Sequence, residues 1–85
     1  MKLYVGNLPR SFTNIDLKKL FNEVGDVSRA TIMTDRKSGH SFCFGFVNMD
    51  HESGQQAIQK LNKRIIDNRS LRVNEVELPI FLPMK

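Results

Sequence analysis

The chain has 85 residues and a net charge of +4, from 13 lysines and arginines against 9 aspartates and glutamates. This length is enough for one small domain and too short for two, and the ordinary apolar and charged fractions exclude wholesale disorder. The single cysteine excludes an intrachain disulfide, and with only two histidines it leaves no zinc-ligand spacing.

The N-terminal part of the chain predicts a strand followed by a helix. Residues 2–6, "KLYVG", alternate apolar and polar side chains as a short strand does, and the turn residues "NLPR" end it. Thr13 is the predicted helix N-cap, with Asp16 in a capping-box relation to it, and Gly25 is expected to close the helix. Apolar side chains recur at helical spacing at Leu17, Leu20, Phe21 and Val24.

The middle of the chain predicts two strands joined by a polar loop. Residues 27–33, "VSRATIM", alternate in the manner of a strand, and the loop at 34–41, "TDRKSGHS", is partly basic. Residues 42–49, "FCFGFVNM", carry phenylalanines on three alternate positions. Because successive side chains of a strand point to opposite faces, the three rings share one side of the sheet.

The remaining elements are a second helix and a fourth strand. Asp50 is the predicted N-cap of the helix, whose apolar stripe consists of Gly54, Ala57, Ile58 and Leu61. Residues 62–70 predict a turn region with a small hairpin around Asp67 and Asn68. Residues 71–76, "LRVNEV", alternate as a strand.

The order β-α-β-β-α-β predicts an α/β two-layer sandwich of the ferredoxin-like type. If each helix connects parallel strands of one sheet, both crossovers should be right-handed. In a four-stranded antiparallel sheet with spatial order 4-1-3-2, such crossovers put both helices on one face. The other face is then left uncovered.

The alternation of side chains indicates which face is covered. The apolar set, in which Gly45 is expected to let a helix come close, is Leu3, Val5, Ala30, Ile32, Cys43, Gly45, Val47, Met49, Leu71 and Val73. The opposite set, which contains no carboxylate, is Lys2, Tyr4, Arg29, Thr31, Met33, Phe42, Phe44, Phe46, Arg72 and Asn74. A core does not hold unpaired cations, so we expect the aromatic face to be the uncovered one.

Burial of the aromatic face is the competing interpretation. Three phenylalanines on one strand are more often core than surface, and the apolar tail at 77–85, "ELPIFLPMK", is a candidate cover, with Phe81 lying over Phe42. Against burial, the opposite face already accounts for both helices. An exposed apolar surface of this size is typical of a binding site.

An uncovered row of rings beside cations is typical of a surface for unpaired nucleobases. Tyr4, Phe44 and Phe46 are placed to stack two or three bases, each stack contributing about 1–3 kcal/mol. Asn74 is placed to read base edges. The cations expected to hold backbone phosphates are Lys2, Arg29 and Arg72 around the rings, and Arg36 and Lys37 with His40 on the loop.

These residues resemble two motifs of the RNA recognition motif family. "LYVGNL" at 3–8 is similar to the family's hexamer and "FCFGFVNM" to its octamer, and the likeness covers residues 2–76. The resemblance implies that the open sheet face binds single-stranded RNA, and possibly single-stranded DNA. Position by position, Tyr4 and Phe44 resemble the two main base-stacking residues, and Phe46 the ring that lies against sugars.

Three octamer positions depart from the family pattern. Phe42 stands where the family has Lys or Arg, which predicts weaker phosphate anchoring. Whether Phe42 stacks on a base, docks the tail or contacts a protein stays open. Cys43 stands in place of a glycine and Met49 in place of an aromatic residue, and both are predicted to lie in the covered core.

We therefore predict an RNA recognition motif domain at residues 1–76, followed by the apolar tail at 77–85. The domain is expected to bind single-stranded RNA as a monomer, without catalysis, cofactor or metal. No stretch approaches the about twenty apolar residues of a membrane span, and no signal-peptide core is present. The free cysteine favours a reducing compartment, so we expect a cytoplasmic protein.

Two other function classes stay open. The first is a protein- or peptide-binding module of the same fold that uses Phe42 and the apolar tail, against which the complete set of Tyr4, Phe44 and Phe46 argues. The second is a small hydrolase of the acylphosphatase type. It needs an Arg and Asn site in a glycine-bearing loop, for which "GNLPR" with Arg10 is only a weak match.

Overall fold

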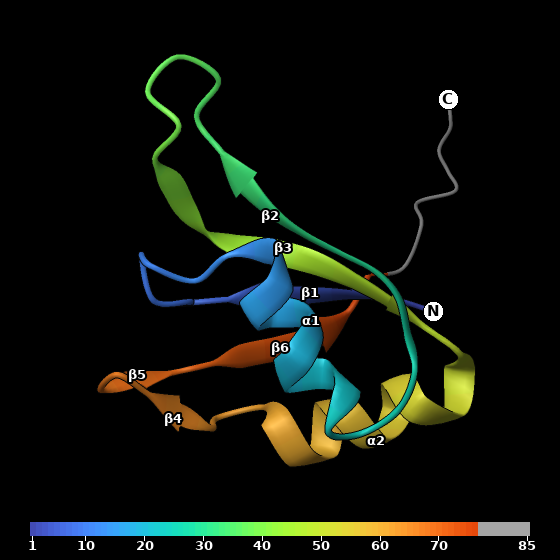
Figure 1. Ribbon diagram of the computed structural model, residues 1–85. Coiled ribbons are helices and arrows are strands. Elements are labelled where there is room, and N and C mark those ends of the chain that lie inside the picture. The colour runs from blue at the N-terminus through green and yellow to red at the C-terminus, as the bar shows by residue number, and fades with distance from the viewer. Residues whose placement is uncertain (77–85) are drawn as a thin grey trace, which may run out of the picture.

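The structure is a computed structural model that describes residues 1–76, and it contains the predicted elements in the predicted order (Figure 1). The elements are β1 Lys2–Gly6, α1 Asn14–Asn22, β2 Val27–Thr34, β3 Ser41–Met49, α2 His51–Leu61, β4 Ile65–Ile66, β5 Arg69–Ser70 and β6 Arg72–Glu75. Strands β4 and β5 form the small hairpin expected around Asp67 and Asn68, which have left-handed φ angles of 51° and 63°. The strand predicted at 71–76 is β6.

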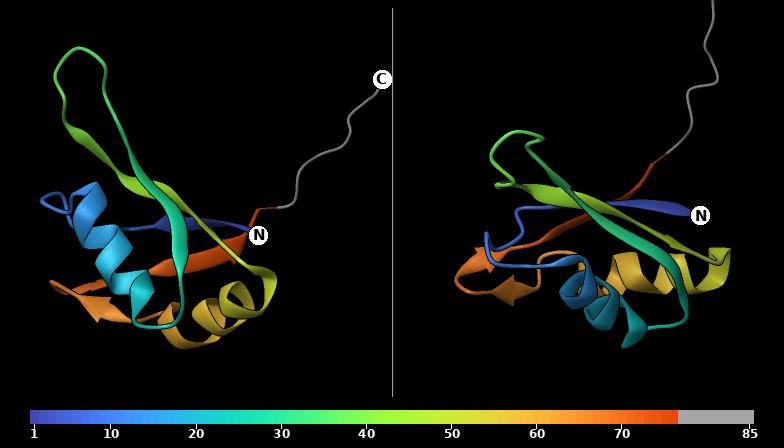
Figure 2. Two further views of the ribbon diagram at one scale, coloured as in Figure 1. Left: turned by 45° about the vertical axis from the view of Figure 1, so that its right-hand side comes forward. Right: turned by 45° about the horizontal axis from the view of Figure 1, so that its top comes forward.

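The main sheet has four strands in the order β2-β3-β1-β6, which is the predicted 4-1-3-2 order counted from the other edge. All three pairings in it are antiparallel. Figure 2 shows both helices on the same side of this sheet, and within residues 1–76 neither a helix nor a strand covers the other side. The predicted two-layer fold is confirmed.

The hydrophobic core lies between the sheet and the two helices. The sheet side contributes Leu3, Val5, Val27, Ile32, Val47, Met49, Leu71 and Val73, and the helices contribute Leu17, Leu20, Phe21, Ala57 and Leu61. Ala30 is partly buried against this cluster. The predicted covered face is therefore the one that packs on the helices, and burial of these side chains drives the docking of the two layers.

Both helices begin at the predicted N-caps. Thr13 and Asp16 form a full capping box, in which Thr13 Oγ1 accepts from Asp16 N–H at 3.1 Å and Asp16 Oδ2 accepts from Thr13 N–H at 2.9 Å. Asp50 Oδ1 accepts from Ser53 N–H at 2.8 Å at the start of α2. The hydrogen bonds from the Ser53 backbone and then its hydroxyl lower the pKa of Asp50. These bonds satisfy N–H groups that a helix start leaves without a partner.

Gly25 and Gly45 each allow a close contact with a neighbouring element that the sequence did not indicate. Helix α1 ends at Asn22, and Gly25 follows three residues later with an N–H donated to Phe21 O at 3.2 Å. A Cβ at Gly25 would collide with the Ser53 side chain on α2. The prediction that Gly45 makes room for a helix is wrong, because a Cβ there would collide with the β2 backbone, 3.0 Å from Ile32 Cα.

The prediction that Cys43 lies in the covered core is also wrong. Cys43 has a left-handed φ of 65° and is only half-buried. Between the pairs Ile32↔Gly45 and Thr34↔Ser41, strand β3 has two residues more than β2. This bulge breaks the alternation of side chains on which the prediction relied. Met49 is buried as predicted, with 3% of its surface exposed.

The sequence left open whether the tail packs near Phe42, and it predicted no membrane span. The contact of Phe81 with Phe42, and the whole tail at 77–85, lie outside the described residues. In the described part of the chain, no helix combines the length and the apolar character needed to cross a membrane.

Candidate nucleic-acid interface

The open face of the sheet carries a continuous row of four rings, Tyr4, Phe42, Phe44 and Phe46, called here the aromatic row. Strand pairing brings it together, since Tyr4 lies opposite Phe46 and Gly6 lies opposite Phe44. The Tyr4 ring centroid is 5.8 Å from that of Phe44 and 6.1 Å from that of Phe46. The Phe44 and Phe46 rings are 6.0 Å apart and nearly perpendicular. All three separations lie in the range that aromatic pairs prefer, and the pairs of Phe46 with Tyr4 and with Phe44 have the favoured edge-to-face geometry.

Phe42 extends this row at the Phe44 end. Its ring lies 6.4 Å from the Phe44 ring at an interplanar angle of 17°, and 56% of its surface is exposed. The other three rings are half-buried, mainly because they pack against one another and the sheet. Within residues 1–76 the aromatic face is thus the uncovered one, as predicted.

The position of the Tyr4 ring depends on Gly6. The two residues are on the same side of β1, and a Cβ at Gly6 would lie 2.5 Å from Tyr4 Oη and 2.8 Å from Cε2. The ring therefore lies along the strand, directly over the glycine. The absence of a side chain at Gly6 is what allows this position.

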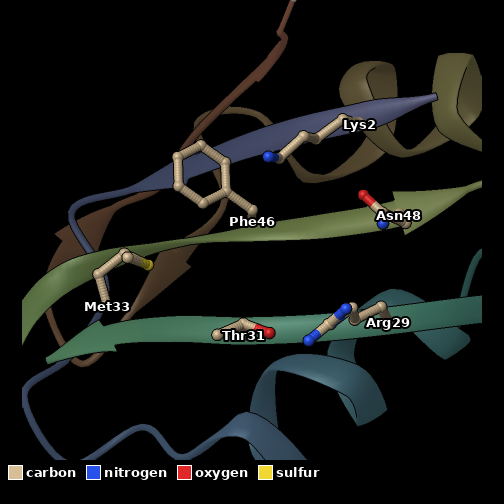
Figure 3. Close-up of a pocket in the computed structure, with 6 residues that line it drawn as sticks. All are labelled: Lys2, Arg29, Thr31, Met33, Phe46 and Asn48. Carbon is tan, nitrogen blue, oxygen red and sulfur yellow. The ribbon is translucent and has the colours of Figure 1, made fainter.

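A shallow pocket of about 290 Å³ lies at the Phe46 end of the row (Figure 3). It is lined by Lys2, Arg29, Thr31, Met33, Phe46 and Asn48. Lys2 Nζ lies 4.7 Å from the centroid of the Phe46 ring, a cation–π geometry. Figure 3 shows Lys2 and Arg29 on the two strands that flank β3. The structure thus brings two of the predicted cations to one end of the row.

A second hollow, of about 520 Å³, lies at the opposite end of the row. It is lined by Tyr4, Asn7, Phe42, Cys43, Phe44 and Arg72, and is called here the Phe42 pocket. Arg72 lies opposite Gly6, and Asn74 lies opposite Tyr4 on the same strand pair. The predicted cations therefore occur at both ends of the row, Lys2 and Arg29 at one end and Arg72 at the other. The side chains of Arg72 and Asn74 are exposed.

The predicted loop cations, Arg36 and Lys37, are placed away from the two pockets. They are exposed on the hairpin loop between β2 and β3, which extends beyond the rest of the sheet (Figure 1). Asp35 organises the loop, since its N–H donates to His40 O at 2.8 Å and its Oδ1 accepts from Lys37 N–H at 2.8 Å. His40 is exposed on the same loop.

Sequence reasoning missed two asparagines of this face. Asn48 lies beside Lys2 in the first pocket, and the alternation of β3 would have placed it there. Asn7 has a left-handed φ of 61°, a conformation that asparagine tolerates better than most residues. Its Nδ2 donates to Ser70 O at 2.9 Å, and its Oδ1 accepts from Arg69 at 3.2 Å. Asn7 thereby fixes the loop after β1 to the β4–β5 hairpin.

An open sheet face with an aromatic row and cations at both ends defines a class of nucleic-acid-binding modules. The family model described as RNA recognition motif matches residues 3–72 of the chain. The chain belongs to the RNA recognition motif family.

Individual relatives agree with this assignment. Small ribosomal subunit protein cS22 of Arabidopsis thaliana is 40% identical over 93% of this chain and 32% of that protein. The putative RNA-binding protein RbpE of Nostoc sp. is 43% identical over 88% of this chain and 77% of that protein. A solved Sex-lethal protein/RNA complex matches with a TM-score of 0.87 and 32% identity, covering 92% of this chain and 47% of that one. The chain spans a third or less of the length of the first curated relatives.

Proposed function

We propose that residues 1–76 form a domain that binds single-stranded RNA on the open face of the sheet. Bases stack on Tyr4 and Phe44, and Phe46 lies against the sugars between them. The observation that carries the proposal is the aromatic row, whose rings are 5.8–6.4 Å apart on a face that no described element covers.

The charged side chains of the proposal act on the backbone of the RNA. Lys2 and Arg29 contact phosphates at the Phe46 end, and Arg72 does so at the other end, beside Asn74, which reads base edges. Arg36 and Lys37 contact RNA that extends past the sheet toward the loop. Each base stack contributes about 1–3 kcal/mol, so two or three stacks with a few phosphate contacts give affinities of about micromolar.

The descriptions of the relatives and of the matching structures support this function. Two are described as RNA-binding proteins and several as ribonucleoproteins, and two of the matching structures are complexes with RNA. Single-stranded DNA remains a second ligand to test, because the stacking faces do not depend on the 2′-hydroxyl. We infer that the domain works by binding alone, as a monomer. A cytoplasmic location stays a prediction, since several relatives are chloroplastic.

The proposal is tested by NMR chemical-shift titration of the chain with short RNA and DNA oligomers. Resonances of β1 and β3 should shift, and Tyr4→Ala and Phe44→Ala should each lower affinity by about 5- to 150-fold. Ile15→Ala is the matched control, because Ile15 is an equally apolar, 65% exposed side chain on α1. Shifts confined to the helices, or alanine variants that bind as tightly as the parent chain, would contradict the proposal.

The peptide-binding alternative is less favoured by the geometry. Phe42 was its main support, and the ring stacks in the same row as Phe44 instead of forming a separate apolar site. The tail, its other support, lies outside the described residues. In the same titration, a peptide-binding module would leave the β1 and β3 resonances unmoved by oligonucleotides.

A further inference from the structure

A third pocket, of about 440 Å³, lies at the β6 edge of the sheet and is called here the edge pocket. Its lining combines Arg72 and Asn74 of β6 with Asn7, Ser70 and Lys63. Every side chain that lines it is neutral or basic, and none is aromatic. Such a pocket suits an anion with several acceptor oxygens rather than a base.

Hydrogen bonds hold the walls of the edge pocket in place. Lys63 N–H donates to Leu71 O at 2.7 Å. Asn62 Oδ1 accepts from Val73 N–H at 3.0 Å. Asn7 Nδ2 donates to Ser70 O at 2.9 Å on the other side. The segment after α2, strand β6 and the loop after β1 are thus tied together, so the pocket is formed before any ligand arrives.

The edge pocket continues the surface of the aromatic row. Asn7 and Arg72 line both this pocket and the Phe42 pocket. Asn7 and Arg72 therefore connect the end of the row at Tyr4 and Phe44 to the pocket that Lys63 lines. Lys63 is exposed, and its ammonium group is a strong donor to phosphate oxygens.

We propose that the edge pocket is a phosphate site for the part of an RNA strand that extends beyond the aromatic row, with Lys63 and Arg72 as its cations. This inference rests on the proposed function and adds a site outside the stacking surface. RNA that covers only the row does not reach Lys63. Longer RNA gains one further phosphate contact there.

The test compares Lys63→Gln with Lys60→Gln, a matched control on the exposed side of α2. Binding of random-sequence RNA tetranucleotides and octanucleotides is measured by fluorescence anisotropy between about 50 and 200 mM salt. For octanucleotides, Lys63→Gln should lower the slope of log K against log salt by about 0.7, the value for one phosphate contact with a single strand. It should leave the tetranucleotide slope unchanged, and Lys60→Gln should change neither slope.

Two results would overturn the edge pocket. If Lys63→Gln leaves the octanucleotide salt slope unaltered, Lys63 makes no phosphate contact. If the slope falls equally for both lengths, the change reflects only the general charge of the protein. Failure of the proposed function gives a different pattern, in which Tyr4→Ala and Phe44→Ala leave the binding of both oligomers unchanged. A urea denaturation curve of Lys63→Gln shows whether the variant is folded, since Gln keeps the same left-handed backbone strain as Lys63, whose φ is 72°.

Discussion

Replacing Gly6 by alanine should separate RNA affinity from stability. The added Cβ would lie 2.5 Å from Tyr4 Oη, 2.8 Å from Cε2 and 2.9 Å from Cζ. Ordinary contacts between carbon atoms are about 3.5–4.0 Å, so the ring has to move by about 1 Å or more. Because the row places each ring against its neighbours, this movement takes Tyr4 out of its position beside Phe44.

The expected loss of affinity follows from the value of one base stack. A stack contributes about 1–3 kcal/mol, which corresponds to a decrease of about 5- to 150-fold in affinity. The free energy of unfolding should stay within about 1 kcal/mol of the parent chain. Glycine within a strand costs about 0.5–1 kcal/mol relative to alanine, and this gain for alanine offsets the about 0.5–1.5 kcal/mol of a displaced side chain.

A double-mutant cycle tests this reasoning. Affinities for a short RNA are measured by calorimetry for Gly6→Ala, for Tyr4→Ala and for the chain with both changes, and stabilities by urea denaturation. In the Tyr4→Ala background Gly6→Ala should have no further effect, because the ring it displaces is absent. The reasoning is refuted if Gly6→Ala binds RNA as the parent does, or if it lowers affinity equally in both backgrounds.

Three further changes give distinct outcomes. Cys43→Gly should raise the free energy of unfolding by about 1 kcal/mol in urea denaturation, since it relieves a left-handed residue, whereas Cys43→Ala, which keeps the strain, should not. Phe42→Arg should tighten binding and steepen the salt slope by about 0.7, while Phe42→Gln should leave the slope as it is. Asp50→Ala should lower thermal stability near neutral pH. Because the folded pKa of Asp50 is lowered, its contribution is present above the ordinary carboxyl pKa and disappears as pH falls through the folded value, so parent and variant should converge in acid.

The arrangement of the sheet and the residues of its open face were largely predictable from the alternation of side chains in the sequence. The alternation in strands 2–6 and 42–49 assigned Tyr4 and the three phenylalanines to one face, and the cations Lys2, Arg29 and Arg72 identified that face as the open one. Such patterns are reliable because a regular strand fixes the side on which each residue lies. The helix N-caps and the hairpin at Asp67 were equally predictable, since they depend on residues close in sequence.

The failures occurred where regular geometry is interrupted or where packing is not local. Cys43 lies in a bulge, and no alternation pattern shows where extra residues enter a strand. Gly45 was assigned to the wrong neighbour, because the atoms beside it belong to β2, and the contact of Gly25 with Ser53 on α2 was not foreseen. The edge pocket combines residues from three segments, and it therefore has no signature in any one of them.

Two of the three unusual octamer residues, Phe42 and Cys43, are adjacent in the irregular part of β3. Neither has a partner residue in the pairing of β3 with β1 or β2 among the described residues. Phe42 is therefore not positioned by the ladder, but by the left-handed backbone at Cys43 and by its stack on Phe44. A glycine at position 43 would relieve the strain and also give the Phe42 ring more freedom. The Phe42 ring thus lies at the end of the aromatic row, stacked on Phe44, at the octamer position where the family pattern has a cation.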